Sequence, residues 1–385
     1  MISNASPAVQ SEALNAMAAI AADNKSIAHP AYLSQADLME LWHQPLRLFR
    51  LANALRETSC GDDVSFVINR NINFTNRCTG TCRFCSFKHH EPYTLSHEEI
   101  LSRAAEAVDQ GATEICLQGG LHPDMALEDY CGILEAIHSA FPKLHLHAYS
   151  PMEVLHMSNN SAVEVEESLR ELLRAGLGSM PGTAAEILVD TVRQFICPDK
   201  LRTEEWRHII TAAHRLKIPT TSTILFGHVE SLEDRLAHFQ VIREIAAETG
   251  GFTEMVLLPF IAENNPLGRD LMRGMLAGTT GGGQEPGARG AAGADLLDRL
   301  KMHALARVAL YPHITNIQAS WTKLGREAAG AALDWGANDL GGTLMDEGIA
   351  RNPCEASSIS TEDLRRIIES RGKKAVQRTT LYRRI

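Results

Sequence analysis

Residues 71–85 read NINFTNRCTGTCRFC, and the three cysteines in this stretch decide how the rest of the chain is interpreted. Cys78, Cys82 and Cys85 follow an apolar segment typical of a β-strand, with the spacing C-x3-C-x2-C. A loop of this length can direct three thiolates at one small object. Structural zinc normally takes four ligands, whereas a [4Fe–4S] cluster held by three cysteines keeps one iron open to a small molecule. The spacing therefore favours a cluster with one open iron.

Two other interpretations of these cysteines stay open. His89 or His90 could complete a zinc site, although zinc ligands usually come as two separated pairs. A structural disulfide is disfavoured, because the N-terminus resembles neither a signal peptide nor a transit peptide and cytosolic thiols stay reduced. We therefore expect a cytoplasmic protein. The other five cysteines are scattered singly: Cys60, Cys116, Cys131, Cys197 and Cys354.

The composition indicates a globular protein with a sizeable core. The chain has 385 residues, of which 44% are hydrophobic and 22% charged, and its formal net charge is −10. The negative charge argues against nucleic acid as a partner. No apolar run approaches the ~20 residues that cross a bilayer, so no membrane span is expected. The basic residues near the C-terminus are interpreted as a solvated helix face.

Strand-like and helix-like segments alternate along the chain. Eight strands are predicted at 66–74, 114–118, 144–150, 177–180, 219–226, 253–258, 315–320 and 339–341. Helices are predicted between them at 96–110, 130–140, 168–175, 203–216, 232–249 and 297–310. Such alternation predicts an α/β protein with a parallel sheet, and eight units predict a (β/α)8 TIM-type barrel. A partial barrel of six units is the alternative.

The barrel is expected to span residues 61–345, with a flexible glycine-rich insertion at about 278–293. Residues 1–60 are expected to form an N-terminal tail and helical extension, and 346–385 a C-terminal helical extension. Active sites on barrels lie at the carboxyl ends of the strands. The cysteine loop follows the first strand, and polar or glycine-rich stretches follow the others. We therefore expect the functional site at that rim.

The cysteine motif resembles that of the radical S-adenosylmethionine (SAM) superfamily. From about residue 69 to 344 the chain is similar, more closely, to the second subunit of FO synthase, the tyrosine 4-hydroxyphenyl transferases. The matching stretches are 71–76, 111–123, 176–186, 220–223, 227–230 and 250–254. Menaquinone-pathway relatives share several of these stretches, but residues 258–261 and 317–325 resemble those relatives less. The glycine-rich insertion and residues 351–360 match the sequence pattern of the FO synthase family poorly.

The resemblance implies a reaction and its partners. The open iron would bind the amino and carboxylate groups of SAM, whose reductive cleavage yields a 5′-deoxyadenosyl radical. That radical would take a hydrogen from L-tyrosine, and the Cα–Cβ bond would break. The 4-hydroxybenzyl fragment would add to C5 of 5-amino-6-(D-ribitylamino)uracil, and the first FO synthase subunit would close the deazaflavin ring. An electron donor is also implied. The alternatives are a futalosine-pathway radical SAM enzyme and a non-enzymatic zinc or electron-transfer protein.

The resemblance also implies roles for individual residues. Cys78, Cys82 and Cys85 should ligate the cluster, with Phe84 packed beside it. The candidates for contacts to SAM are Gln118, Gly119 and Gly120. The candidates for contacts to either SAM or the amine of the substrate are Ser150, Ser179, Glu186 and Thr223. The two glycines would let the backbone approach the ligand closely. The candidates for substrate contacts are His228, Gln318 and Ser320. His145 and His147 should point to the same side of their strand. If that side faces inward, the histidines should form hydrogen bonds in the barrel interior.

Overall fold

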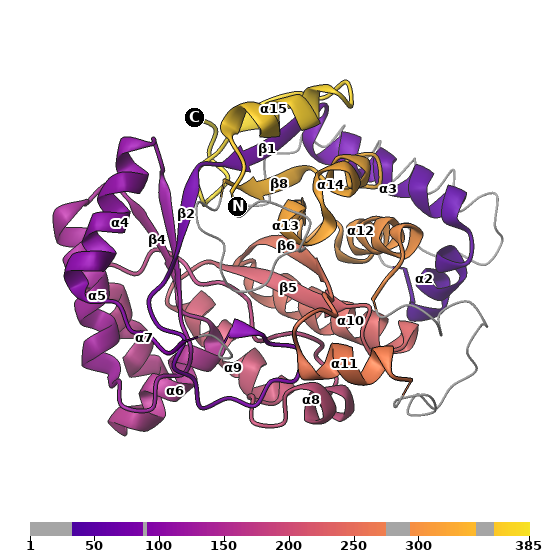
Figure 1. Ribbon diagram of the computed structural model, residues 1–385. Coiled ribbons are helices and arrows are strands. Elements are labelled where there is room, and N and C mark those ends of the chain that lie inside the picture. The colour runs from indigo at the N-terminus through magenta and orange to yellow at the C-terminus, as the bar shows by residue number, and fades with distance from the viewer. Residues whose placement is uncertain (1–32, 88–90, 275–292, 344–357) are drawn as a thin grey trace.

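The structure is a computed structural model that describes residues 33–87, 91–274, 293–343 and 358–385 (Figure 1). The N-terminal tail before residue 33 and almost all of the predicted insertion at 278–293 lie outside the described residues. None of the helices in the described ranges is long and apolar enough to cross a membrane.

The strands are all parallel to their neighbours and their pairings run around a ring. Their bounds are β1 (Asp63–Val67), β2 (Asn69–Asn73), β3 (Glu114–Gln118), β4 (His145–Ala148), β5 (Thr220–Phe226), β6 (Phe252–Pro259), β7 (Ile317–Ala319), β8 (Asp339–Gly342) and β9 (Lys374–Gln377). β2, β3 and β4 pair in that order, and β5 to β8 pair in sequence before β8 returns to β1. Bridges from His147 to Ser179 and from Met180 to Thr220 connect β4 to β5. The predicted barrel architecture is confirmed.

Two predicted strands differ in detail from the observed ones. The first, expected as one strand over 66–74, is split at Ile68 into β1 and β2. The split lets the chain change partners, because β1 pairs with β8 and β9 while β2 pairs with β3. The fourth, expected over 177–180, consists of the two single bridges at Ser179 and Met180.

The helices surround the strands. They are α2 (Gln35–Trp42), α3 (Pro45–Cys60), α4 (His97–Asp109), α5 (Leu127–Ala140), α6 (Pro151–Ser161), α7 (Val165–Arg174), α8 (Asp190–Ile196), α9 (Thr203–Arg215), α10 (Leu232–Thr249), α11 (Pro266–Met272), α12 (Leu296–Leu310), α13 (Trp321–Leu324), α14 (Arg326–Ala332) and α15 (Thr361–Glu369). Figure 1 shows α4, α5 and α7 on one side of the strands and α3, α10 and α12 on the other. The outer faces of the strands are buried under these helices, and β5 is buried along its whole length.

The C-terminal segment differs from the helical extension that the sequence predicts. After α15 the chain forms β9, which pairs with β1 in register from Asp63 opposite Lys374 to Phe66 opposite Gln377. The C-terminus therefore ends against the sheet of the barrel. Helices α2 and α3 precede the barrel, and α3 packs against α12.

Buried histidines are a feature of this core. Burial lowers the pKa of His147, His214 and His303 to about 4 and that of His238 to about 3. His303 is fully buried, and its Nδ1 lies 2.7 Å from the carbonyl oxygen of Arg299, which requires a proton on Nδ1. These side chains are therefore neutral in the folded protein near pH 7.

We expect the stability of the protein to fall as the pH is lowered from about 6.5 to about 4. In that window the unfolded chain binds protons that the buried histidines exclude, so each lowered pKa costs stability as the pH drops. For His303 the loss is about 2 kcal/mol at pH 5 relative to pH 8. Urea unfolding at both pH values measures it. His303→Met should reduce the pH dependence by that amount, and His208→Gln, at an exposed position of α9, should not. An unchanged slope in His303→Met would contradict the assignment.

Candidate active site

The cysteine loop is fixed to the segment after β3 and to the last residue of α8 by backbone hydrogen bonds. Gly120 N donates to Thr75 O at 2.8 Å, and Thr79 N donates to Leu121 O at 3.0 Å. Arg83 N donates to Ile196 O at 2.8 Å. The positions of the three thiols therefore follow from the barrel itself.

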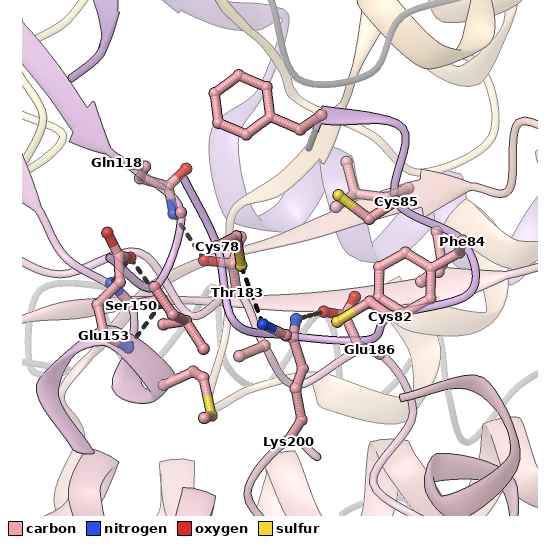
Figure 2. A pocket seen from close by; sticks show the side chains of 18 of the residues that line it. Cys78, Cys82, Phe84, Cys85, Gln118, Ser150, Glu153, Thr183, Glu186 and Lys200 are labelled. Atoms are coloured by element: carbon pink, nitrogen blue, oxygen red, sulfur yellow. Dashed lines mark hydrogen bonds and ion pairs between the residues drawn. The ribbon is translucent and has the colours of Figure 1, made fainter. Parts of the chain in front are cut away.

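The thiols line a cavity of about 250 Å³ at the carboxyl ends of the strands. Figure 2 shows Cys82 and Cys85 on one side, Gln118, Ser150 and Glu153 on the other, and Cys78 between them. The apolar part of the cavity wall is formed by Phe84, Leu225, Leu258 and Phe260. Such a cavity, mostly apolar with a few polar groups, is typical of a ligand site.

The glycines after β3 are required by packing against the cysteine loop. A Cβ atom on Gly119 would lie 2.6 Å from the ring of Phe74, and one on Gly120 would lie 2.4 Å from Arg77 O. Both glycines also line the cavity, where the sequence predicts a close approach to ligand. The structure adds a reason that the sequence did not show, which is the close approach of the strand end to the loop.

Glu153 is a site residue that the sequence analysis missed. It lies in the first turn of α6 and lines the cavity while being only 2% exposed. Its carboxylate accepts hydrogen bonds from Gly119 N at 2.9 Å and from Ser150 Oγ at 2.7 Å. Burial raises the pKa of Glu153, although these hydrogen bonds oppose the shift. The pattern Ser150-x-x-Glu153 is a capping box, and this signal in the sequence could have revealed both α6 and its glutamate.

Lys200 is a second residue that was missed. Its Nζ lies 2.5 Å from Glu186 Oε1, and both side chains line the cavity (Figure 2). Burial works to lower the pKa of Lys200, but the Glu186 carboxylate beside it outweighs burial and raises that pKa. The ammonium group is therefore charged, beside the cysteine whose thiol pKa burial raises to about 12. No motif marks this lysine in the sequence.

The backbone that carries Glu186 is strained and clamped. Ala184 and Glu186 have φ values of 67° and 44°, which non-glycine residues rarely adopt. The buried Arg193 holds this segment, because its guanidinium donates to Ala184 O at 3.0 Å and to Ile187 O at 3.2 Å. Arg193 Nε also donates to Leu201 O at 3.1 Å, next to Lys200. One arginine thus fixes both members of the ion pair.

Eight of the residues predicted from the sequence lie together in the cavity wall. They are Cys78, Cys82, Cys85, Gln118, Gly119, Gly120, Ser150 and Glu186, and Phe84 lies with them. Gln118 donates from Nε2 to Thr183 Oγ1 at 2.8 Å, and Thr183 also lines the cavity.

The structure places the other five predicted residues away from the cavity wall. Ser179 Oγ lies 2.7 Å from His145 Nε2 and 2.7 Å from His147 Nδ1, so both histidines form hydrogen bonds on the same side of their strand, as expected. Thr223 Oγ1 donates to Gly182 O at 2.9 Å, and Ser320 Oγ lies 3.0 Å from Thr322 Oγ1.

His228 and Gln318 also have protein partners. His228 Nε2 lies 3.1 Å from Leu225 O and packs edge-on against Phe260, behind the cavity. Gln318 Nε2 donates to Glu254 Oε2 at 3.1 Å, deeper in the barrel. The alternative zinc ligands His89 and His90 lie outside the described residues.

The residues present fit a cluster held by three cysteines. Three thiols line one cavity, and Gly80 keeps the space between two of them open, because a Cβ there would lie 3.4 Å from Cys78 Sγ and 3.9 Å from Cys82 Sγ. The cavity continues past the thiols to polar groups that a bound cofactor could contact.

Comparisons with known proteins agree with this geometry. Residues 72–242 match the radical SAM superfamily, and residues 290–384 match the CofH/MqnC C-terminal region. The 5-amino-6-(D-ribitylamino)uracil–L-tyrosine 4-hydroxyphenyl transferase 1 of Methanosarcina barkeri is 50% identical over 341 residues, covering 88% of this chain and 87% of the relative. The transferase of that name from Archaeoglobus fulgidus is 48% identical, covering 90% of this chain and 95% of the relative. This chain belongs to the family of these radical SAM transferases.

Solved structures support the fold. Methylornithine synthase (PylB) superposes with a TM-score of 0.67 at 17% identity, covering 89% of this chain and 94% of that one. The FeFe-hydrogenase maturase HydG from Carboxydothermus hydrogenoformans superposes with a TM-score of 0.70 at 16% identity, covering 99% of this chain and 85% of that one. These two proteins thus share the arrangement of strands and helices of this chain.

Gly120→Ala should impair the cysteine loop. The added methyl group would force Arg77 O away, which we expect to cost about 1–3 kcal/mol of stability and to lower the iron and sulfide bound after anaerobic reconstitution. Gly132→Ala is the matched control, because its Cβ in α5 would meet only His97 at 3.5 Å and should raise stability by up to about 1 kcal/mol. Wild-type cluster content in Gly120→Ala would contradict this account.

Proposed function

We propose that this chain transfers the 4-hydroxybenzyl group of L-tyrosine to C5 of 5-amino-6-(D-ribitylamino)uracil, in the biosynthesis of the deazaflavin FO. The observation that carries the proposal is the similarity of about 50% identity, over most of both chains, to transferases named for these two substrates. The cavity supports it, since three thiols and a set of polar groups meet at the carboxyl ends of the strands. The first FO synthase subunit, the electron donor and the cytoplasmic location stay predictions.

The cofactors of the proposal are a [4Fe–4S] cluster and SAM. Cys78, Cys82 and Cys85 would hold the cluster, and when bound the two cofactors supply the one-electron chemistry that removes a hydrogen atom from substrate. The protein must position substrate and exclude water and stray hydrogen donors. Leu225, Leu258 and Phe260 make part of the cavity wall apolar, which suits that task.

The cavity also offers partners for the polar ends of SAM. Lys200 and Glu186 present a cation and an anion side by side, which matches a zwitterionic amino-acid group. Gln118, Ser150 and Glu153 face them across the cavity and offer donors and acceptors to hydroxyl or amino groups (Figure 2). We include all five in the proposed binding site for SAM and substrate.

The test is product analysis of the reconstituted protein given SAM, a reductant, tyrosine and ribitylaminouracil. We expect 5′-deoxyadenosine and, by mass spectrometry, the 4-hydroxybenzyl adduct of the uracil. Cys82→Ala should lose both products together with most of the iron, because a ligand is removed. Cys131→Ala, in α5, should retain them.

Other outcomes separate the alternatives. Release of 5′-deoxyadenosine with futalosine-type substrates, and not with tyrosine and the uracil, would favour the menaquinone-pathway activity. Colourless protein that binds zinc tightly would exclude the enzymatic proposal altogether. Full turnover by Cys82→Ala would remove that cysteine from the ligand set.

Lys200→Met should weaken SAM binding about 10- to 100-fold, because it removes one charge-assisted hydrogen bond worth about 1.5–3 kcal/mol. Equilibrium binding of SAM to the cluster-loaded protein measures this, and the iron content should stay at the wild-type level. The double variant Lys200→Met with Glu186→Gln avoids an unpaired carboxylate and should still bind SAM weakly. Lys143→Met changes an exposed lysine and serves as the control. Unchanged affinity in both Lys200 variants would exclude Lys200 from the SAM site.

A further inference from the structure

The C-terminal tail enters the barrel at the end opposite the cysteines. After β9, Arg378 N donates to Phe66 O at 2.9 Å, which continues the pairing with β1. The chain then turns back, since Thr379 N donates to Arg383 O at 2.8 Å and Arg378 forms a bridge with Arg384. The side chain of Arg378 is buried at this turn and that of Tyr382 is partly buried, beside residues near the start of β6 and β8.

Arg378 forms a buried ion-pair network there. Its Nε lies 2.5 Å from Asp339 Oδ2, and its Nη2 lies 3.1 Å from Asp339 Oδ1 and 3.4 Å from Glu254 Oε2. Arg378 is 3% exposed and Asp339 is fully buried. The pairing with Asp339 is bidentate, the geometry in which arginine fixes a carboxylate most firmly.

Glu254 is the point where the tail meets the barrel interior. The hydroxyl of Tyr382 and Gln318 Nε2, at 3.1 Å, both donate to Oε2 of Glu254, and Arg378 approaches the same oxygen. The guanidinium carbon of Arg378 also lies 4.0 Å from the ring centroid of Tyr382. Two residues of the tail thus fix the carboxylate that orients Gln318.

Gln318 lies on the inner face of the barrel, opposite Val256 of β6. The inward residues Cys116, Val256 and Gln318 are partly exposed, whereas their neighbours Ile115 and Leu257 are fully buried under the helices. Gln118 and Leu258, the next inward residues along β3 and β6, line the cavity. The inner face of the barrel therefore runs from the cysteine cavity down to Gln318.

The buried charges of Arg378, Asp339 and Glu254 add little net stability to the fold. Burying an arginine and two carboxylates costs about as much as their attraction returns, and an apolar floor of similar volume would often be as stable. What the network does provide is a fixed orientation for Gln318, an uncharged amide with one donor and one acceptor end. An uncharged amide suits hydroxyl or ureide groups better than it suits a zwitterionic amino acid, which needs charged partners.

We propose that the C-terminal tail supplies the floor of the reaction chamber, where Arg378 and Tyr382 act as positioning residues that orient Gln318 toward the polyol or ureide group of the ribitylaminouracil. This inference rests on the proposed function. It assigns the uracil substrate to the deep side of the chamber and leaves tyrosine and SAM near the cysteines.

Tyr382→Phe is the most direct test, because it removes only the hydroxyl that donates to Glu254 and keeps the ring against Arg378. We expect the KM for ribitylaminouracil to rise about 5- to 20-fold. The KM for tyrosine, the iron content and the release of 5′-deoxyadenosine with tyrosine alone should stay at wild-type values. Arg378→Gln should show a larger effect in the same direction. Arg384→Gln is the control in the same tail, since Arg384 is exposed and pairs with Asp63 at the surface.

Hydrogen exchange of the β1 amides shows whether each variant keeps β9 in place. If Arg378→Gln loses that protection, Tyr382→Phe alone decides the inference. An unchanged KM for the uracil in Tyr382→Phe, or equal changes in the KM values of both substrates, would overturn it while leaving the proposed function intact. If the wild-type protein releases 5′-deoxyadenosine but forms no adduct, the proposed function fails and this inference fails with it.

Discussion

The close approach of two backbone segments determines the geometry of the site. Residues 119–121 lie so near the cysteine loop that a methyl group on Gly120 would overlap Arg77 O, and hydrogen bonds join the segments at Thr75 and Thr79. Behind them Phe74 packs edge-on against Tyr130 and Tyr149, with ring centroids 5.9 and 6.0 Å apart. A loop with three thiols has little structure of its own, so its shape must come from a rigid neighbour. Here that neighbour is the end of β3.

The buried charges around the cavity follow from the same arrangement. Lys200 and Glu186 pair beside Cys82 because Arg193 holds the strained backbone of residues 184–187. Glu153 is held by Ser150 and Gly119. In each case a polar side chain is taken out of water and its orientation is fixed by hydrogen bonds before any ligand arrives. Preorganised charge of this kind interacts strongly with a bound ligand because little reorganisation remains to be done.

Periodicity and spacing predicted much of this protein because they depend on local sequence. The alternating strands and helices and the cysteine motif follow from the sequence alone, and the helix expected over 96–110 is observed as α4, with a capping box formed by Ser96 and Glu99. The missed features depend on distant contacts or on competing local signals. Ser150 was assigned to the end of a strand, although with Glu153 it starts α6. Lys200 looks like any surface lysine until the fold brings Glu186 to it. Ser179 stands in a matching motif, yet two histidines of the neighbouring strand occupy its hydroxyl.

The two ends of the barrel are built by different means, and the strands explain why. At the carboxyl ends, loops after the strands bring thiols and charges from many parts of the chain to one place. At the amino ends, polar residues near the start of β6 and β8 lie beside Arg378 and Tyr382 of the C-terminal tail. A strand rises about 3.3 Å per residue, so Glu254 and Leu258 are separated by about 13 Å on one face of β6. One strand therefore carries both a residue of the proposed floor and a residue of the cavity wall, which holds the two at a fixed separation.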